Sequence, residues 1–205
     1  MLRPLRIALD RRRHRHGDWG HVFEPYSGDE VVSLDCETSG LDPRRDAIIS
    51  VGAVVLKERR ILTSEALDIT LAPPDQLDPE SVTVHKLRKL DLQGGLAVEE
   101  AMRQVLDFVS NRPILGYHVG FDAAMLDRHI EPLFGFRLPN PLIELADVYL
   151  RRCSRPGSGL EADLRLEKIA GRLGMPVPKG RHTALKDAVF TAALYVRLMY
   201  GDSKK

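Results

Sequence analysis

The sequence has 205 residues, of which 43% are hydrophobic and 29% are charged, and its formal net charge is +1. This is the size and composition of one soluble globular domain, and it excludes a strongly basic protein that coats a long duplex. Two cysteines exclude a disulfide framework, and no apolar run approaches the ~20 residues of a membrane span, so we expect a cytoplasmic protein without a membrane partner.

Residues 1–28 are predicted to be a basic N-terminal extension, and residues 29–205 to be the functional domain. The run Arg11–His16 consists of four arginines and two histidines, and no apolar core of a signal peptide follows it. Leu2–Leu9 indicates a short helix. We expect this extension to be solvated and frayed.

Three β-rich segments open the domain. Val31–Glu37 ends in a turn signal, Ala47–Lys57 is a long apolar run rich in Val and Ile, and Ile61–Leu71 follows a tight connection. Such closely spaced strands favour an antiparallel meander.

Helices and strands then alternate. Val98–Val109 has apolar residues at a period of 3.6, Pro113–Val119 is typical of a buried strand, and a helix is predicted to begin at Asp122. Further helices are expected at Ser81–Leu92, Leu164–Leu173 and Thr183–Met199, and Leu142–Leu150 fits either a strand or a helix. An opening meander followed by this alternation predicts an α/β domain with a mixed sheet.

Asp35 and Glu37 are two positions apart on the first predicted strand, so both side chains leave the same face and Cys36 leaves the other. Two adjacent carboxylates repel each other unless a cation neutralises them, and Mg²⁺ or Mn²⁺ prefers carboxylate oxygens. Taken alone, the pair fits a solvated strand end better than a metal site.

Two further acidic positions stand near predicted helix starts. Asp122 follows the buried strand, where an ordinary N-cap is the simpler interpretation. Asp187 lies in the first turn of the last helix, and His182 ends the loop before it. An imidazole there suits a general base near neutral pH, although a lone surface histidine would be unremarkable.

The order of these residues resembles the three motifs of the DEDDh (DnaQ-like) 3′–5′ exonucleases, which include the proofreading epsilon subunit of bacterial DNA polymerase III. Asp35–Leu41 (DCETSGL) is similar to the family's D-x-E-T-T-G-L, and Gly116–Asp122 (GYHVGFD) keeps its F-D. Arg181–Ala188 (RHTALKDA) is similar to R-H-x-A-x-x-D-A. The resemblance runs from about residue 30 to 200.

The resemblance implies a ribonuclease-H-like fold, with a five-stranded mixed sheet flanked by helices. It also implies that Asp35, Glu37, Asp122 and Asp187 hold two Mg²⁺ or Mn²⁺ ions and that His182 is the base. The substrate would be the single-stranded 3′ end of a nucleic acid, DNA before RNA, released as nucleoside 5′-monophosphates. The residues implied to bind the substrate are Thr38, Gly40, Leu41, Phe121 and His85.

Two places depart from the family pattern. His118 stands four residues before Asp122, where the family often has Asn, and we expect it to alter packing or substrate grip without removing a metal ligand. The segment Val84–Leu87 (VHKL) is similar to the family's I-H-G-I, with Lys86 in place of a small residue. His85 therefore fits either a contact with the terminal base or a half-buried helix residue.

Two alternatives stay open from the sequence. One is an exoribonuclease that trims RNA 3′ ends, and the other is a non-catalytic accessory module of a polymerase. The sequence ends soon after the last predicted helix, so a stand-alone enzyme is expected before a replicative subunit, with room for a polymerase or repair partner.

Overall fold

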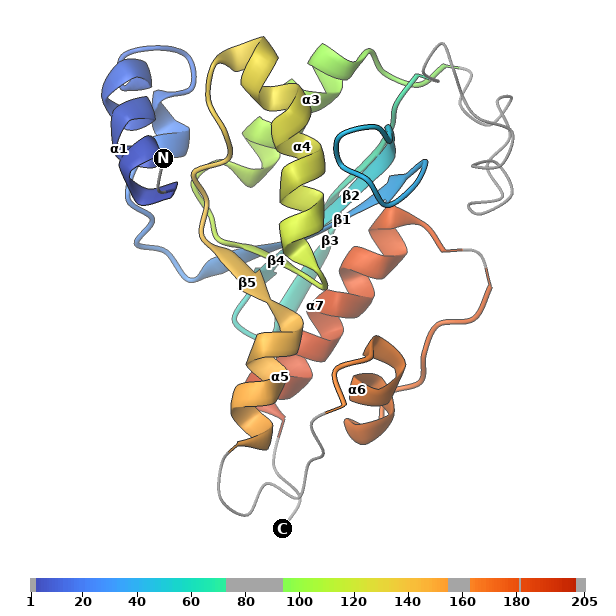
Figure 1. Cartoon of the computed structure of the whole chain (residues 1–205). Coiled ribbons are helices and arrows are strands. Elements are labelled where there is room, and N and C mark those ends of the chain that lie inside the picture. The colour runs from blue at the N-terminus through green and yellow to red at the C-terminus, as the bar shows by residue number, and fades with distance from the viewer. Residues whose placement is uncertain (1–2, 73–93, 155–162, 181, 202–205) are drawn as a thin grey trace.

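The computed structural model describes residues 3–72, 94–154, 163–180 and 182–201 (Figure 1). Five strands form one mixed sheet in the order β3-β2-β1-β4-β5. The strands are β1 (Glu30–Thr38), β2 (Ile48–Lys57), β3 (Arg60–Thr70), β4 (Ile114–Gly116) and β5 (Leu142–Glu144). β1, β2 and β3 are antiparallel neighbours, whereas β4 and β5 run parallel to β1. The α/β class and the mixed five-stranded sheet are therefore confirmed.

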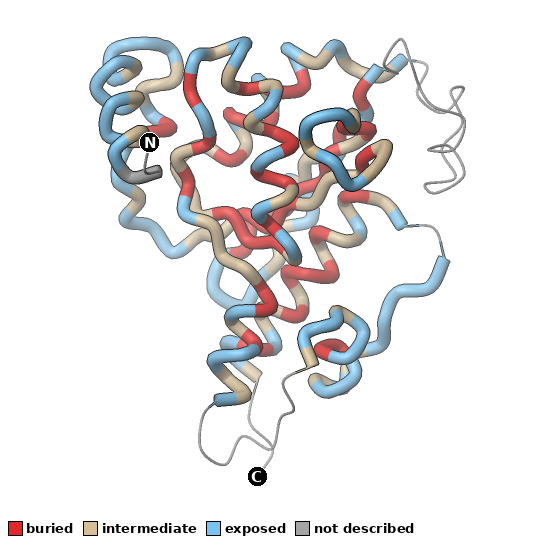
Figure 2. Tube along the Cα trace, in the orientation of Figure 1, coloured by how far each residue is buried: buried red, intermediate tan, exposed pale blue. Residues whose placement is uncertain are grey.

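Helices cover both faces of the sheet. The helices are α1 (Arg3–His14), α3 (Val98–Val109), α4 (Val119–Phe134), α5 (Leu145–Cys153), α6 (Leu166–Arg172) and α7 (Ala184–Tyr200). In Figure 1, α3 and α4 lie on one side of the sheet and α5, α6 and α7 on the other. Each side has its own apolar cluster, and Figure 2 shows that the buried positions follow the sheet and the helix faces turned toward it.

The central strand β1 supplies side chains to both clusters because its side chains alternate between the faces. Val32 and Leu34 pack with α3 and α4. Ser33 faces the other way and donates a hydrogen bond from Oγ to the carbonyl of Ala188 in α7, over 2.8 Å. Asp35, Cys36 and Glu37, which follow on β1, alternate between the two faces in the same way.

The predicted boundary between the buried strand and the helix that follows it is wrong. β4 ends at Gly116, and α4 begins at Val119 instead of Asp122. The segment Leu142–Leu150, which fitted either a strand or a helix, divides between β5 and α5. Both changes have one cause, because the Glu144 carboxylate accepts N–H groups from His118, Val119 and Ala146, and so caps the first turns of α4 and α5 together. The expected helix at Ser81–Leu92 lies outside the described residues.

The N-terminal segment is packed, in contrast to the frayed extension expected from its composition. It contains α1 and a short 3₁₀ turn, η1 (Gly20–Phe23), whose Val22 and Phe23 are buried in the cluster shared with α4. The His14 ring stacks on Phe23, and Phe23 meets Phe136 edge-on, with ring centroids 5.9 and 5.1 Å apart. Aromatic rings therefore hold a strongly charged segment against the domain.

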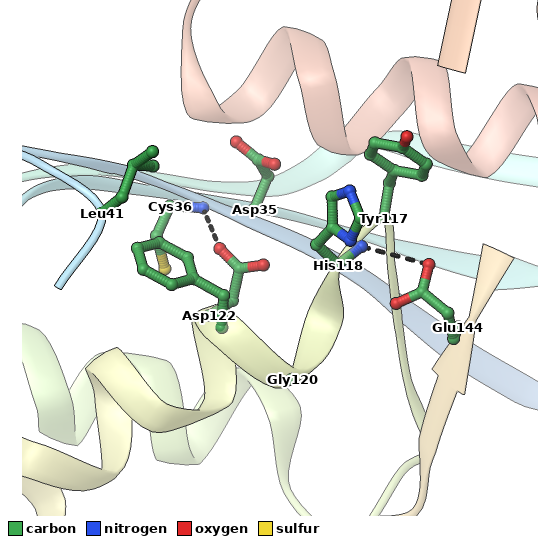
Figure 3. Close-up of a pocket in the computed structure, with 9 residues that line it drawn as sticks. Asp35, Cys36, Leu41, Tyr117, His118, Gly120, Asp122 and Glu144 are labelled. Carbon is green, nitrogen blue, oxygen red and sulfur yellow. Dashed lines mark hydrogen bonds between the residues drawn. The ribbon is translucent and has the colours of Figure 1, made fainter. Parts of the chain in front are cut away.

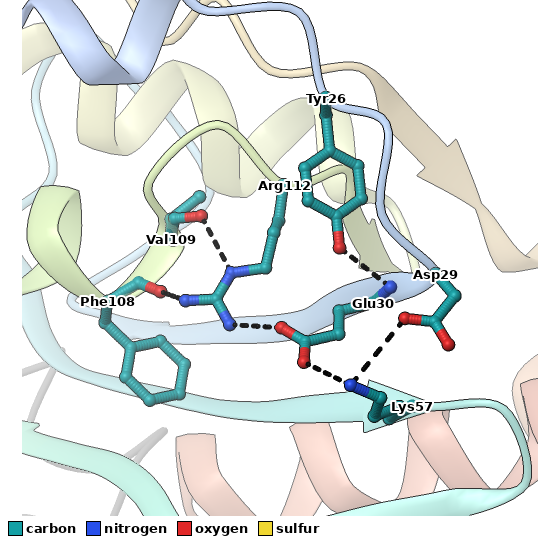
Figure 4. A network of polar contacts seen from close by, with 7 residues as sticks. All are labelled: Tyr26, Asp29, Glu30, Lys57, Phe108, Val109 and Arg112. Atoms are coloured by element: carbon teal, nitrogen blue, oxygen red, sulfur yellow. Dashed lines mark hydrogen bonds and ion pairs between the residues drawn. The ribbon is translucent and has the colours of Figure 1, made fainter.

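A polar network fixes the chain where it enters β1 (Figure 4). The Glu30 N–H donates to the Tyr26 hydroxyl over 2.8 Å, and the Glu30 carboxylate pairs with Arg112 and Lys57 at 3.0 and 3.3 Å. Arg112 also donates to the carbonyls of Phe108 and Val109 at the end of α3. The start of the central strand is thus tied to a neighbouring strand and helix. Within the described residues, no helix is both long and apolar enough to span a membrane.

Candidate active site

Asp35 and Glu37 lie near the end of β1, on its α7 face, as the alternation predicts, and Cys36 packs into the opposite cluster. The register between β1 and β2 shifts between Glu37 and Thr38. A bulge of this kind re-aims side chains at the end of a strand. The carboxylates are therefore presented where the sheet pairing becomes irregular.

The first turn of α7 lies directly on β2. A Cβ added to Gly52, the cross-strand partner of Asp35, would stand 2.1 Å from the Leu185 nitrogen. Only the missing side chain lets the helix backbone approach so closely. The Thr183 side chain caps this helix by accepting the Lys186 N–H over 3.3 Å. Gly52 and the cap together bring Asp187, in this first turn, to the Asp35 face of the sheet.

Asp122 reaches the same place from α4. It lies in the first turn but does not cap the helix, because its Oδ1 accepts the backbone N–H of Cys36 over 3.0 Å. The side chain is buried, with 4% of its surface exposed. The N-cap interpretation of Asp122 is therefore wrong: this carboxylate bridges α4 to the functional end of β1.

The four carboxylates influence one another electrostatically. Burial first, and then the negative charges of Asp122, Asp187 and Glu37, together raise the pKa of Asp35 from 3.8 to about 9. Burial likewise raises the pKa of Asp122 to about 7, although the hydrogen bond from Cys36 opposes this shift. The structure therefore brings together the four acidic residues that the sequence singled out.

This donor set fits divalent cations. Buried carboxylates that repel one another are the oxygen ligands that Mg²⁺ and Mn²⁺ prefer, and a bound cation would relieve the repulsion at Asp35. As the side chains are placed, no three His, Cys, Asp or Glu residues among those described surround one point closely enough to ligate an ion. Small side-chain movements would therefore accompany binding.

His182 stands beside the cluster, in the loop before α7. Its Nδ1 lies 3.1 and 3.2 Å from the two carboxylate oxygens of Asp187, and its side chain is 69% exposed. The ring is thus held at one edge by Asp187 and open to solvent elsewhere. An imidazole oriented by a carboxylate has the arrangement of a general base.

An open cavity of about 620 Å³ adjoins Asp35 and Asp122. Figure 3 shows Leu41 on one side of the two carboxylates, and Tyr117, His118 and Glu144 on the other. Leu41 is 87% exposed, and Phe121 lines the cavity and packs partly into the core. The cavity therefore offers apolar surface next to the acidic cluster.

The loop after β1 is ordered by its own hydrogen bonds. The Thr38 hydroxyl donates to the Gly40 carbonyl over 2.7 Å. Gly40 packs against Asp46, whose Oδ2 would lie 2.5 Å from a Cβ added there and accepts the Asp42 N–H over 2.7 Å. These contacts fix the loop that carries Leu41. His85, the remaining predicted substrate residue, lies outside the described residues.

His118, in the place of the family's Asn, adopts the left-handed backbone conformation (φ 61°, ψ 34°) before α4. Asn and His are among the few residues other than glycine that occupy this region readily, so the exchange preserves the backbone. Its ring centroid lies 4.3 Å from that of Tyr117 at the cavity wall. Sequence reasoning missed Tyr117, Gly52 and Glu144; the one available signal was an acidic residue inside the apolar stretch at Leu142–Leu150.

A five-stranded mixed sheet with acidic residues at the end of its central strand defines a ribonuclease-H-like fold. The solved structure of Escherichia coli exonuclease I with an oligonucleotide has this fold, with a TM-score of 0.66 and 21% identity over 84% of this chain and 41% of that one. The sequence profile of the exonuclease family RNase_T matches residues 32–195. The chain therefore belongs to the exonuclease family, and its resemblance to the DnaQ-like 3′–5′ exonucleases is confirmed.

Individual relatives agree. The chain is 28% identical to the DNA polymerase III epsilon subunit of Aquifex aeolicus, over 82% of this chain and 79% of the relative. It is 34% identical to the oligoribonuclease of Streptomyces griseus over 53% of this chain and 60% of that enzyme. It spans only 12% of the PolC-type DNA polymerase III of Thermotoga petrophila, to which it is 28% identical over 171 residues.

Proposed function

We propose that this protein is a 3′–5′ exonuclease that hydrolyses the terminal phosphodiester bond at single-stranded 3′ ends and releases nucleoside 5′-monophosphates. Two Mg²⁺ or Mn²⁺ ions would be held by four residues: Asp35, Glu37, Asp122 and Asp187. The observation that carries the proposal is that the four carboxylates approach one end of β1 from β1, α4 and α7, close enough for the other three to raise the pKa of Asp35.

The catalytic roles follow from the placement of the side chains. Divalent ions bound to the four carboxylates would polarise the scissile phosphate and make water a stronger nucleophile at neutral pH. His182 would accept the proton of that water. If its Nδ1 donates a proton to Asp187, the lone pair of Nε2 is left free for this purpose.

The cavity would hold the end of the strand. Leu41 and Phe121 would pack on the terminal base, which must leave its stack to enter, so a single strand fits better than a duplex. Polar backbone groups near Thr38 and Gly40 would meet the 3′-hydroxyl group. His85 stays a candidate for the same base.

DNA is the substrate that we favour, because the relatives found over most of the chain are DNA polymerase III proteins. In agreement with these relatives, we propose a polymerase or a repair protein as the protein partner. The similarity to an oligoribonuclease supports the second candidate, an exoribonuclease that trims RNA 3′ ends. DNA and RNA oligonucleotides of the same sequence, compared by kcat/KM, distinguish the two.

The proposal is tested by Asp187→Asn, which keeps the size of the side chain but removes its charge. We expect metal-dependent release of labelled monophosphate from a 3′-labelled oligonucleotide to fall to background. Asp147→Asn is the matched control, because Asp147 also lies in the first turn of a helix, α5, away from the acidic cluster. Full activity in Asp187→Asn, or no release by the wild type with any divalent cation, would refute the proposal.

The base is tested by His182→Ala. We expect kcat to fall ~10²–10⁴-fold, the range for loss of a general base, with little change in KM. His21→Ala removes another exposed histidine and should change neither quantity. A wild-type kcat in His182→Ala would contradict the role of His182.

A further inference from the structure

The N-terminal helix carries a concentration of positive charge that the active site does not use. Residues 3–16 contain six arginines and one aspartate, in a chain whose formal net charge is only +1, so the rest of the chain is net negative. Arg11, Arg12 and Arg15 line one hollow of about 550 Å³ between α1 and η1, and we call these three residues the arginine patch.

The arginine patch is free to bind an anion. All three side chains are exposed, and no hydrogen bond or ion pair engages them among the described residues. Glu24 is the one acidic residue lining the hollow, so a positive surplus remains. Guanidinium groups bind phosphate oxygens through paired N–H donors, which makes a phosphate chain the complementary partner.

The patch is also held in a fixed place. His14, between Arg12 and Arg15 in the sequence, lies beside Gly135, the residue that ends α4: a Cβ added to Gly135 would be 3.6 Å from the His14 ring. Arg6 pairs with Glu131 of α4, and the Trp19 ring lies 5.2 Å from that of Phe134. Figure 1 shows α1 beside the end of α4 that is remote from the sheet strand β4.

Helix α4 therefore links the patch to the active site. Asp122 lies in its first turn, and Gly135 follows 13 residues later, a separation of about 20 Å along a helix axis. A second hollow, of about 820 Å³, runs along α4 from Gly120, which also lines the active-site cavity, to Glu131. At Glu131 this hollow reaches the residue that pairs with Arg6 of α1.

We propose that the arginine patch binds the phosphate backbone of the substrate strand on the 5′ side of the terminal nucleotide. The inference rests on the proposed exonuclease function. At ~3.4 Å per stacked nucleotide, about six nucleotides span the ~20 Å of α4 between Asp122 and the residue that lies beside α1. Longer strands touch both sites, whereas strands of two to four nucleotides (about two-thirds of this length or less) touch only the active site.

The test compares long and short substrates. In the variant Arg11→Gln/Arg12→Gln/Arg15→Gln, we expect KM for a strand of about 20 nucleotides to rise about tenfold while kcat is unchanged. For a strand of about four nucleotides, neither constant should change. The slope of log KM against log salt for the long strand should fall by about 2, because each phosphate contact on a single strand contributes ~0.7.

The control variant Arg60→Gln/Arg151→Gln/Lys168→Gln removes the same charge from exposed positions of β3, α5 and α6. A rise of KM that is equal in both variants, or equal for long and short strands, would overturn the inference. Polyglutamate that competes for the patch as strongly as the nucleic-acid strand, at the same charge concentration, would also overturn the inference. That result would indicate an acidic protein partner. Wild-type cleavage of the short strand reports the exonuclease function separately, so the two proposals fail in distinguishable ways.

Discussion

At the scale of single residues, the carboxylates of the acidic cluster repel one another in the absence of cations. The carboxyl of Asp35 is ionised in an unfolded chain above pH 4, but its folded-state pKa is about 9. Folding therefore binds a proton between these two pH values, and the free energy of unfolding of the metal-free protein should fall as pH rises through this window. Bound divalent cations should reverse the effect by stabilising the ionised form.

Asp35→Asn tests this balance. With a chelator present at pH 8, we expect the variant to have a Tm several degrees above that of the wild type, because ~1 kcal/mol changes Tm by ~2–4 °C in a chain of this size. At pH 4 the variant and the wild type should have the same Tm. The variant should be inactive because it lacks a predicted metal ligand. Thermal melts across this pH range provide the measurement, with the exposed Asp107→Asn on α3 as the control. A wild-type Tm that rises from pH 5 to 8 would contradict the explanation.

The residues that form the cluster could be found in the sequence, but their contacts could not. The spacing of Asp35 and Glu37 fixes their common face, and the motif order marks Asp122 and Asp187. That Asp122 accepts the Cys36 N–H depends on where α4 begins, and this boundary is set by Glu144, 22 residues further along the chain. Local pattern carries no information about such a long-range cap.

At the scale of secondary structure, long periodic elements were predictable and short ones were not. The bounds of α3 are those that its apolar period predicts. Strand β2 differs from its predicted range by one residue at one end, and β1 and β3 differ by one residue at each end. β4 and β5 have three residues each, too few to establish a period, and pairing with β1 determines their extent. Tertiary contacts overrode local preference there.

Gly52 is the position at which packing between elements governs the site. In Gly52→Ala the new Cβ would overlap the backbone of Ala184 and Leu185, so the first turn of α7 must move away from β2. We expect a loss of ~1–3 kcal/mol in stability, as for overpacked cores, and a larger proportional loss of kcat because Asp187 moves with the helix.

Urea unfolding and oligonucleotide cleavage measure the two effects of Gly52→Ala. Gly171→Ala in α6 is the matched control, since nothing lies within 4 Å of its added Cβ and alanine favours a helix. Its stability should be unchanged or slightly higher, and its activity should be that of the wild type. Wild-type kcat in Gly52→Ala would show that the close approach of α7 to β2 does not position the site.

At the scale of the whole molecule, the N-terminal segment and the exonuclease domain share one core. The family profile begins at residue 32, and we retain residues 29–205 as the proposed exonuclease domain and 1–28 as a basic extension. Val22 and Phe23 nevertheless pack with Val32 of β1 and Ile130 of α4 in a single apolar cluster. Sequence composition concealed this, because the surrounding arginines suggest a solvated segment.

This shared core predicts that the extension stabilises the entire fold. Phe23 is only 6% exposed and contacts the rings of His14 and Phe136, so Phe23→Ala should lower the free energy of unfolding by ~3–5 kcal/mol in one cooperative transition. Leu9→Ala, at a residue of α1 that is 52% exposed, should change it little. Urea unfolding followed by fluorescence and by circular dichroism measures both variants. An independent appendage would instead give wild-type stability for residues 29–205 in Phe23→Ala, together with a separate early transition.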